Sequence, residues 1–383
     1  MKKLFLFSLI LSFSLSAFSS KWQNISSATP AEVTTELVSS NVESSVIRLN
    51  LEGFLQAPVN TPRGEAYVIA VEGATPLQEA GAPDLPKVTS SVIIPDLGRM
   101  ELEVISSEYV GYQNILIAPS KGNLPRDIDP STVPYEFGDI YNIDAFFPAE
   151  QGMLRDPYIV RDLRGQTIVF HPFRYNPVTK TLRVYTEITF SVTNGGGTGV
   201  NPLLRQAPLT TVDYSFSKIY AKHFLNYQNG NRYDPIEEYG NYLIISHGPF
   251  MSAMDPFIEW KKQIGYPVEI VDVSTIGNAP AIELFIQDYY DSKGVTFVLL
   301  VGDAPQVPTS STSAGDSDVA YSYVAGNDHY PDLFVGRFSA ETVDQLNTQV
   351  ERTITYEKEP PTDVDWFTIC TGIASDQGPG DDG

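Results

Sequence analysis

The chain changes its hydrophobic periodicity about halfway along. From about Ser45 to Thr193, apolar and polar residues alternate in short runs that proline and glycine interrupt. A period of two residues places one face of a strand in a core and the other in solvent. The runs cover residues 45–52, 65–72, 89–94, 100–107, 166–171 and 181–192. Many short strands at this spacing, without a helical period between them, predict an antiparallel all-β sandwich or barrel.

The second half alternates between apolar strands and amphipathic helices. Strands that are apolar on both faces are predicted at residues 242–246, 267–273 and 296–301. Apolar residues have helical spacing in the segments between them, at residues 250–264 and 279–292. Strands that are apolar on both faces are typical of a parallel sheet with helices packed on both faces. The pattern continues with strands at 319–324, 333–338 and 367–374 and a helix at 341–357.

A polar stretch separates the two halves. Residues 194–199 are rich in glycine and predict a loop, and residues 215–225 then carry a short helical period. Residues 226–235 are polar and rich in turn formers, as an exposed domain linker should be. Exposed segments of this kind are where proteases cut.

Composition and charge exclude several classes of function and of stabilising bond. The 383 residues carry 25 basic and 47 acidic side chains, a formal charge of −22. A nucleic-acid partner is excluded because the chain cannot neutralise a phosphate backbone. The charge suits a solvated extracellular protein or one that binds hard cations. The single cysteine, Cys370, excludes an intramolecular disulfide and a cysteine-based zinc cluster.

The first residues predict export. Lys2 and Lys3 precede an apolar run over residues 4–15, and the small residues Ala17 and Ser19 follow at the spacing that signal peptidase prefers. The run is too short to span a bilayer, and no later segment reaches the ~18 apolar residues that a spanning helix needs. We therefore expect a signal peptide over residues 1–19, a secreted or cell-surface protein, and no transmembrane segment.

Acidic residues at the expected sheet edge are the strongest candidates for a ligand site. Asp303 directly follows an apolar strand, and Asp328 and Asp332 share the loop over residues 326–332. Calcium prefers six to eight oxygen ligands from carboxylates and carbonyls, which this loop and Asp303 would supply together. The simpler interpretations are that Asp303 caps a turn and that the loop is an ordinary polar loop.

The sequence contains no evident set of residues for nucleophilic catalysis. A cysteine peptidase needs a thiolate beside an imidazole, whereas Cys370 lies within an apolar strand and reads as a small core residue. Neither His247 nor His329 has an evident partnership with it, and His171 reads as structural. No glycine pattern for a dinucleotide or a Walker-type phosphate loop occurs. We expect the chain as given to be catalytically inert.

Several motifs after residue 224 resemble the gingipain family of cysteine peptidases. They occur in family order at residues 224–238, 256–265, 298–303, 324–330, 334–339 and 349–357. The earlier part is more loosely similar to the gingipain propeptide, around residues 81–86 and 173–177. The resemblance implies an exported zymogen with a signal peptide (1–19), an inhibitory β-sandwich propeptide (20–232) and the first part of a caspase-like α/β peptidase domain (233–383).

The resemblance also implies roles for individual residues. A structural calcium ion would be held by the side chains of Asp303, Asp328 and Asp332 and by main-chain oxygens of Ala325 and Tyr330. Asp332 stands where the family has the longer glutamate. Processing would occur between Arg232 and Tyr233. The family's catalytic histidine and cysteine would lie beyond Gly383.

The implied partners are protein or peptide substrates and the chain's own propeptide, docked on the peptidase domain. Two other interpretations keep part of this picture. One is a secreted calcium-binding surface module without catalysis, and the other is a sorting peptidase of the secretion machinery.

Overall fold

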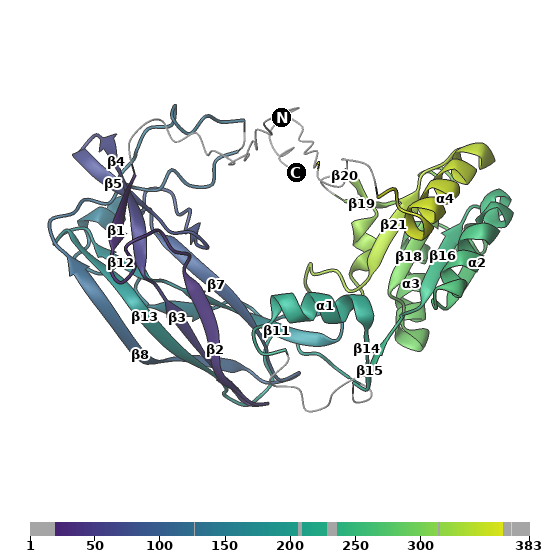
Figure 1. The fold of residues 1–383 in the computed structure, drawn as a ribbon, viewed down its shortest axis with the longest axis horizontal. Coiled ribbons are helices and arrows are strands. Elements are labelled where there is room, and N and C mark those ends of the chain that lie inside the picture. Colours follow the sequence, from purple (N-terminus) through teal and green to yellow (C-terminus); the bar gives the residue numbers. More distant parts are fainter. Residues whose placement is uncertain are drawn as a thin grey trace, which may run out of the picture.

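The computed structural model describes residues 20–125, 127–205, 209–227, 236–312, 315–362 and 369. They form a β-rich part and an α/β part, with helix α1 (Tyr214–His223) lying between them (Figure 1). The expected signal peptide, Arg232, Tyr233 and Cys370 lie outside the described residues. Within the described residues, no helix is both long and apolar enough to cross a membrane.

The β-rich part consists of antiparallel sheets. One sheet has the order β10-β11-β7-β6, with β9 also paired to β11, and a second has the order β12-β13-β3-β2, with β8 also paired to β13. A smaller sheet has the order β1-β4-β5. The strands of the first sheet are β6 (Thr75–Pro76), β7 (Pro86–Ile93), β9 (Gly152–Leu154), β10 (Tyr158–Val160) and β11 (Leu163–Phe170). Those of the others are β1 (Lys21–Asn24), β2 (Thr34–Ser40), β3 (Ser44–Asn50), β4 (Gly53–Thr61), β5 (Gly64–Ala70), β8 (Met100–Tyr112), β12 (Phe173–Asn176) and β13 (Thr181–Asn194).

Alternation along these strands builds a common core. In β3, buried and half-buried residues alternate without a break, so that Ile47 and Leu49 are fully buried. They join Val92 of β7, Phe170 of β11 and Phe190 of β13 in one hydrophobic cluster. Each of the six predicted strands is confirmed, with shifted ends. A 3₁₀ turn, η1 (Asp139–Asn142), lies in the long connection before β9.

A short parallel strand pair and α1 join the two parts. Strand β14 (Thr211–Asp213) runs parallel to β15 (Ile236–Glu238). Asp213 then caps α1, because its carboxylate accepts hydrogen bonds from the backbone N–H groups of Ser215 and Phe216. Phe216 and Tyr220 of this helix pack in one cluster with Tyr158, Val160 and Leu163 of the β10–β11 hairpin.

The α/β part is built on a parallel sheet of order β17-β16-β18-β21. Its strands are β16 (Tyr242–Ser246), β17 (Val268–Asp272), β18 (Phe297–Val301) and β21 (Phe334–Phe338), and its helices are α2 (Asp255–Gln263), α3 (Ala279–Lys293) and α4 (Val343–Lys358). Leu243 packs with residues of α3, whereas its neighbour Ile244 packs with residues of α2 and α4. Helices therefore cover both faces of the sheet, as the apolar strands predicted.

The remaining elements of this part are short. The predicted helix at 250–264 begins as the 3₁₀ turn η2 (Gly248–Met254) and becomes α2 only at Asp255. The 3₁₀ turn η3 (Val273–Thr275) follows β17, and the hairpin of β19 (Ser310–Thr312) and β20 (Gly315–Ser317) follows β18.

The predicted strand at 319–324 is wrong. Residues Val319–Ser322 form the 3₁₀ turn η4, in which Ser322 donates its hydroxyl to the carbonyl of Val319. Alternation of Val319, Tyr321 and Tyr323 suggested a strand, yet only Tyr321 is buried, and its hydroxyl donates to the carbonyl of Pro308. Of the predicted strand at 367–374, only Ile369 is described.

Candidate functional site

Asp303 is positioned by a glycine turn at the carboxyl end of β18. Gly302 has a φ of +129°, and a Cβ there would meet the Cβ of Gln306 at 2.8 Å. The Asp303 N–H donates to the carbonyl of Ala340, and one carboxylate oxygen accepts the hydroxyl of Ser339 at 2.8 Å. The Ser339 hydrogen bond lowers the pKa of Asp303. Asp303 is thus held as a charged group at the edge of the sheet.

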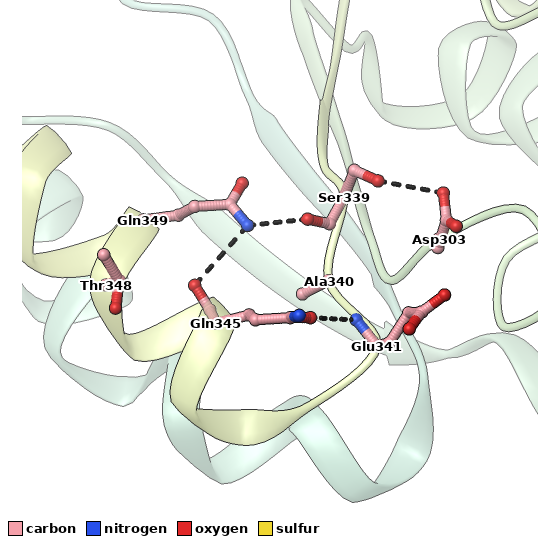
Figure 2. Close-up of a pocket in the computed structure, with 7 residues that line it drawn as sticks. All are labelled: Asp303, Ser339, Ala340, Glu341, Gln345, Thr348 and Gln349. Atoms are coloured by element: carbon pink, nitrogen blue, oxygen red, sulfur yellow. Dashed lines mark hydrogen bonds between the residues drawn. The ribbon is translucent and has the colours of Figure 1, made fainter.

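A polar pocket of about 450 Å³ adjoins this carboxylate. Figure 2 shows Asp303 and Ser339 at one end of it and the first turns of α4 along the other side. Gln349 donates to the carbonyl of Ser339, and Gln345 accepts the N–H of Glu341, completing the cap of α4. The polar groups of the pocket are largely engaged with one another.

Asp332 lies in a different place and is fully buried. One of its carboxylate oxygens accepts the backbone N–H groups of Val324 and Ala325, at 3.0 and 2.8 Å. The other accepts the N–H of Arg161, in the β-rich part, at 2.7 Å. Burial raises the pKa of Asp332 to about 6, and the three N–H donors oppose that rise. The side chain therefore organises its own loop and also contacts the other part of the molecule.

Asp328 divides its oxygens in the same way. Its Oδ1 accepts the backbone N–H of Tyr330, two residues ahead, at 2.9 Å. Its Oδ2 accepts the N–H of Ile159 at 2.8 Å and the side-chain amide of Asn201 at 2.7 Å, both from the β-rich part. All four carboxylate oxygens of Asp328 and Asp332 are thus engaged by N–H donors.

The oxygens of Asp328 and Asp332 that were expected to bind calcium accept N–H hydrogen bonds in this structure. A carboxylate has about four lone-pair sites, so these bonds leave capacity for a cation. In the described part of the chain, no three His, Cys, Asp or Glu side chains are grouped to hold a metal. Asp303, which is bonded to Ser339, is not grouped with Asp328 and Asp332.

The candidate catalytic residues are only partly described. The single cysteine lies outside the described residues. His247 follows β16, where its N–H donates to the carbonyl of Val301 and its ring contacts that of Phe250. His329 packs edge-on against Tyr323. Both imidazoles make ordinary local contacts.

The sequence reasoning missed the residues that meet the acidic loop. Arg161 and Asn201 contact Asp332 and Asp328 across sequence separations of 171 and 127 residues. No local pattern carries such a contact. The one available signal was that two residues separate the apolar run Tyr158–Val160 from Leu163, a spacing typical of a tight hairpin.

Two family models match the chain in succession. The model Propeptide_C25 matches residues 26–230, and the model Peptidase family C25 matches residues 236–383. The first match alone covers more than half of the chain.

Curated relatives agree with these matches. Gingipain R2 of Porphyromonas gingivalis is 37% identical over 378 residues, covering 95% of this chain and 51% of the relative. Gingipain R1 of the same organism is 38% identical over 339 residues, covering 87% and 34%. The chain thus spans between about a third and about half of these relatives' length. A solved complex of Porphyromonas gingivalis RgpB pro- and mature domains aligns with a TM-score of 0.48 at 36% identity, covering 51% of this chain and 96% of that one.

Proposed function

The chain belongs to peptidase family C25, and from this premise we propose that it is the zymogen of a secreted, gingipain-like cysteine endopeptidase. The observation that carries the proposal is the order of the two matches, a propeptide over 26–230 followed directly by a peptidase over 236–383. The proposed domains are a signal peptide (1–19), a β-sandwich propeptide (20–232) and a caspase-like peptidase domain starting at residue 233. Family membership favours this function over a non-catalytic calcium-binding module.

The proposed chemistry is hydrolysis of peptide bonds in protein substrates. A histidine activates a cysteine thiolate, which attacks the substrate carbonyl, while backbone amides stabilise the oxyanion. We place this dyad beyond Gly383, since Cys370 belongs to an apolar segment. What the residues described here contribute is the sheet, its covering helices and the surface on which the propeptide rests.

Processing and calcium complete the proposal. Cleavage after Arg232 would give a mature domain that starts at Tyr233, a bond within the polar linker. Calcium is proposed as a structural ion of the released domain, because Asp328 and Asp332 share a loop with the carbonyls of residues 325 and 330. No catalytic step depends on it.

The test labels cysteines in the full-length precursor before and after maturation. We expect a thiol-reactive iodoacetamide probe to modify one cysteine downstream of Gly383 and to abolish peptide hydrolysis in proportion. The control, Cys370→Ser, should keep both the labelling and the activity. Hydrolysis that survives complete labelling, or labelling confined to Cys370, would refute the peptidase assignment. Sequencing the mature N-terminus checks Tyr233, and sequencing the exported precursor checks the leader.

A further inference from the structure

The tip of the β10–β11 hairpin contains an arginine in an unfavourable backbone conformation. Arg161 has a φ of +48°, in the left-handed region that favours glycine. Residues held in such conformations persist only where the surroundings fix them, and they concentrate at functional contacts. The hairpin is otherwise regular, with Val160 paired to Leu163. A two-residue hairpin loop favours positive φ at its first residue, so the turn itself accounts for part of this conformation.

The Arg161 side chain reaches into the peptidase part. Its guanidinium donates to the carbonyls of Val295 and Asp332, at 2.5 and 3.0 Å. It also lies over the rings of Phe216 and Tyr290, 5.1 and 5.4 Å from their centroids. A largely buried guanidinium that contacts two rings and donates to two carbonyls is strongly held, because charge-assisted hydrogen bonds and cation–π contacts add to one another. Arg161 thus has an extensive set of contacts across the two parts.

The backbone of the same hairpin engages the acidic loop. The N–H of Ile159 in β10 donates to Asp328, and the N–H of Arg161, directly after β10, donates to Asp332. Tyr158 stacks on Tyr330 with ring centroids 4.2 Å apart. Asn201, with a φ of +49°, donates to Asp328 and accepts the N–H of Asn327.

In Asp328 and Asp332, the two oxygens of each carboxylate accept hydrogen bonds from different parts of the molecule. In each, one oxygen is bound by N–H groups of residues 324–330 and the other by N–H groups of the β-rich part. One oxygen of each aspartate thus stabilises the loop itself, and the other accepts hydrogen bonds from the β-rich part. Negative acceptors that face paired backbone donors form a specific docking surface.

We propose that residues 158–161 together with Asn201, here called the latch, hold the propeptide on the peptidase domain by occupying Asp328 and Asp332. The latch rests on the proposed function, since it assigns the residues that keep the zymogen's two domains together. It takes the acceptors that were expected to bind calcium, so propeptide docking does not require the cation. Arg161 is its anchor.

Hydrogen–deuterium exchange of the full-length precursor tests the latch without measuring activity. In Arg161→Ala we expect amides of residues 324–332 and of Ile159 to exchange about tenfold faster or more, because charged hydrogen bonds are lost. Exchange in β13 and β18 should stay unchanged. Asn201→Ala should give a smaller effect confined to the Asp328 end of the loop.

The control is Arg174→Ala, since Arg174 donates to the carbonyls of Pro148 and Ala149 within the β-rich part. It should leave residues 324–332 unaffected. Equal exchange in the wild type and in both latch variants would overturn the proposal. So would wild-type protection of Ile159 and Arg161 that is lost in a calcium chelator, because a cation would then hold the contact. A failure of the cysteine-labelling test leaves these outcomes readable, since none of them depends on catalysis.

Discussion

Asp213 caps helix α1 and also binds the backbone at the junction between the two parts. Two different substitutions of Asp213 can distinguish these roles. The side chain is buried. One oxygen, Oδ1, accepts the N–H groups of Ser215 and Phe216 at the start of α1, at 2.8 and 3.1 Å. The other, Oδ2, accepts the N–H of Gly240 at 2.9 Å, just before β16.

The magnitudes follow from the bonds lost. Removing an N-cap costs about 0.5–2 kcal/mol, and a hydrogen bond to a charged acceptor contributes about 1.5–3 kcal/mol. We therefore expect Asp213→Ala to weaken this region by about 2–5 kcal/mol in total. Asp213→Asn should keep the cap through its carbonyl oxygen, but its NH₂ group then faces the N–H of Gly240, so only the junction bond is lost.

Amide exchange resolves the two effects in one experiment. Asp213→Ala should accelerate exchange at Ser215, Phe216 and Gly240, whereas Asp213→Asn should accelerate Gly240 alone, by about tenfold. Asp255→Asn is the control, because Asp255 lies in the first turn of α2 and that helix has no side-chain cap hydrogen bond. The reasoning is refuted if Asp213→Asn loosens α1 as much as Asp213→Ala does, or if Gly240 is insensitive to both.

Three further predictions concern the stability of each part. Arg164 is buried and donates to main-chain oxygens of residues 95, 98, 200 and 201, so Arg164→Met should lower the urea midpoint of the β-rich part by the equivalent of about 3 kcal/mol or more. Leu300 is fully buried in β18, and Leu300→Ala should destabilise the α/β part by about 2–5 kcal/mol in urea unfolding. Burial lowers the pKa of His223, which is hydrogen-bonded to Tyr158 at 2.6 Å. The unfolded ring takes up a proton below about pH 6.5 before the folded ring does, so stability falls as the pH drops. His223→Gln should flatten that decline in melting temperature between pH 8 and 5, and an unchanged slope would count against the assignment.

Local patterns predicted most of the α/β part because its elements are locally determined. Strand β16 was placed with the observed ends, since a run of buried aliphatic residues bounded by polar ones leaves little choice. The capping box at Thr342 and Gln345 similarly marks the start of α4. In the β-rich part, strands without clean alternation were missed. In β2, for example, Val38 and Ser39 are both exposed, which breaks strict alternation where the pairing with β3 is irregular.

The error at residues 319–324 has a specific cause. Alternation of Val319, Tyr321 and Tyr323 satisfied the rule for a strand, but a strand also needs a neighbour for its backbone N–H groups. The N–H of Val324 instead donates to Asp332, eight residues further along. A side-chain acceptor replaced the strand partner, and the segment turned. Sequence periodicity reports burial and does not report which acceptor the backbone finds.

The same reasoning applies to the candidate site. Asp328 and Asp332 were singled out, together with Asp303, as calcium ligands, because calcium prefers carboxylate and carbonyl oxygens. Residue type and spacing indicate that these carboxylates need binding partners, but they do not identify the partners. The donors are amides of Ile159 and Arg161, 169 and 171 residues away, on a hairpin whose own sequence contains no sign of its target. The acidic loop of this zymogen can therefore be neutralised either by a cation or by N–H donors, and its sequence is the same in both cases. The folded precursor distinguishes the two, because N–H groups of the propeptide lie within 2.8 Å of both carboxylates.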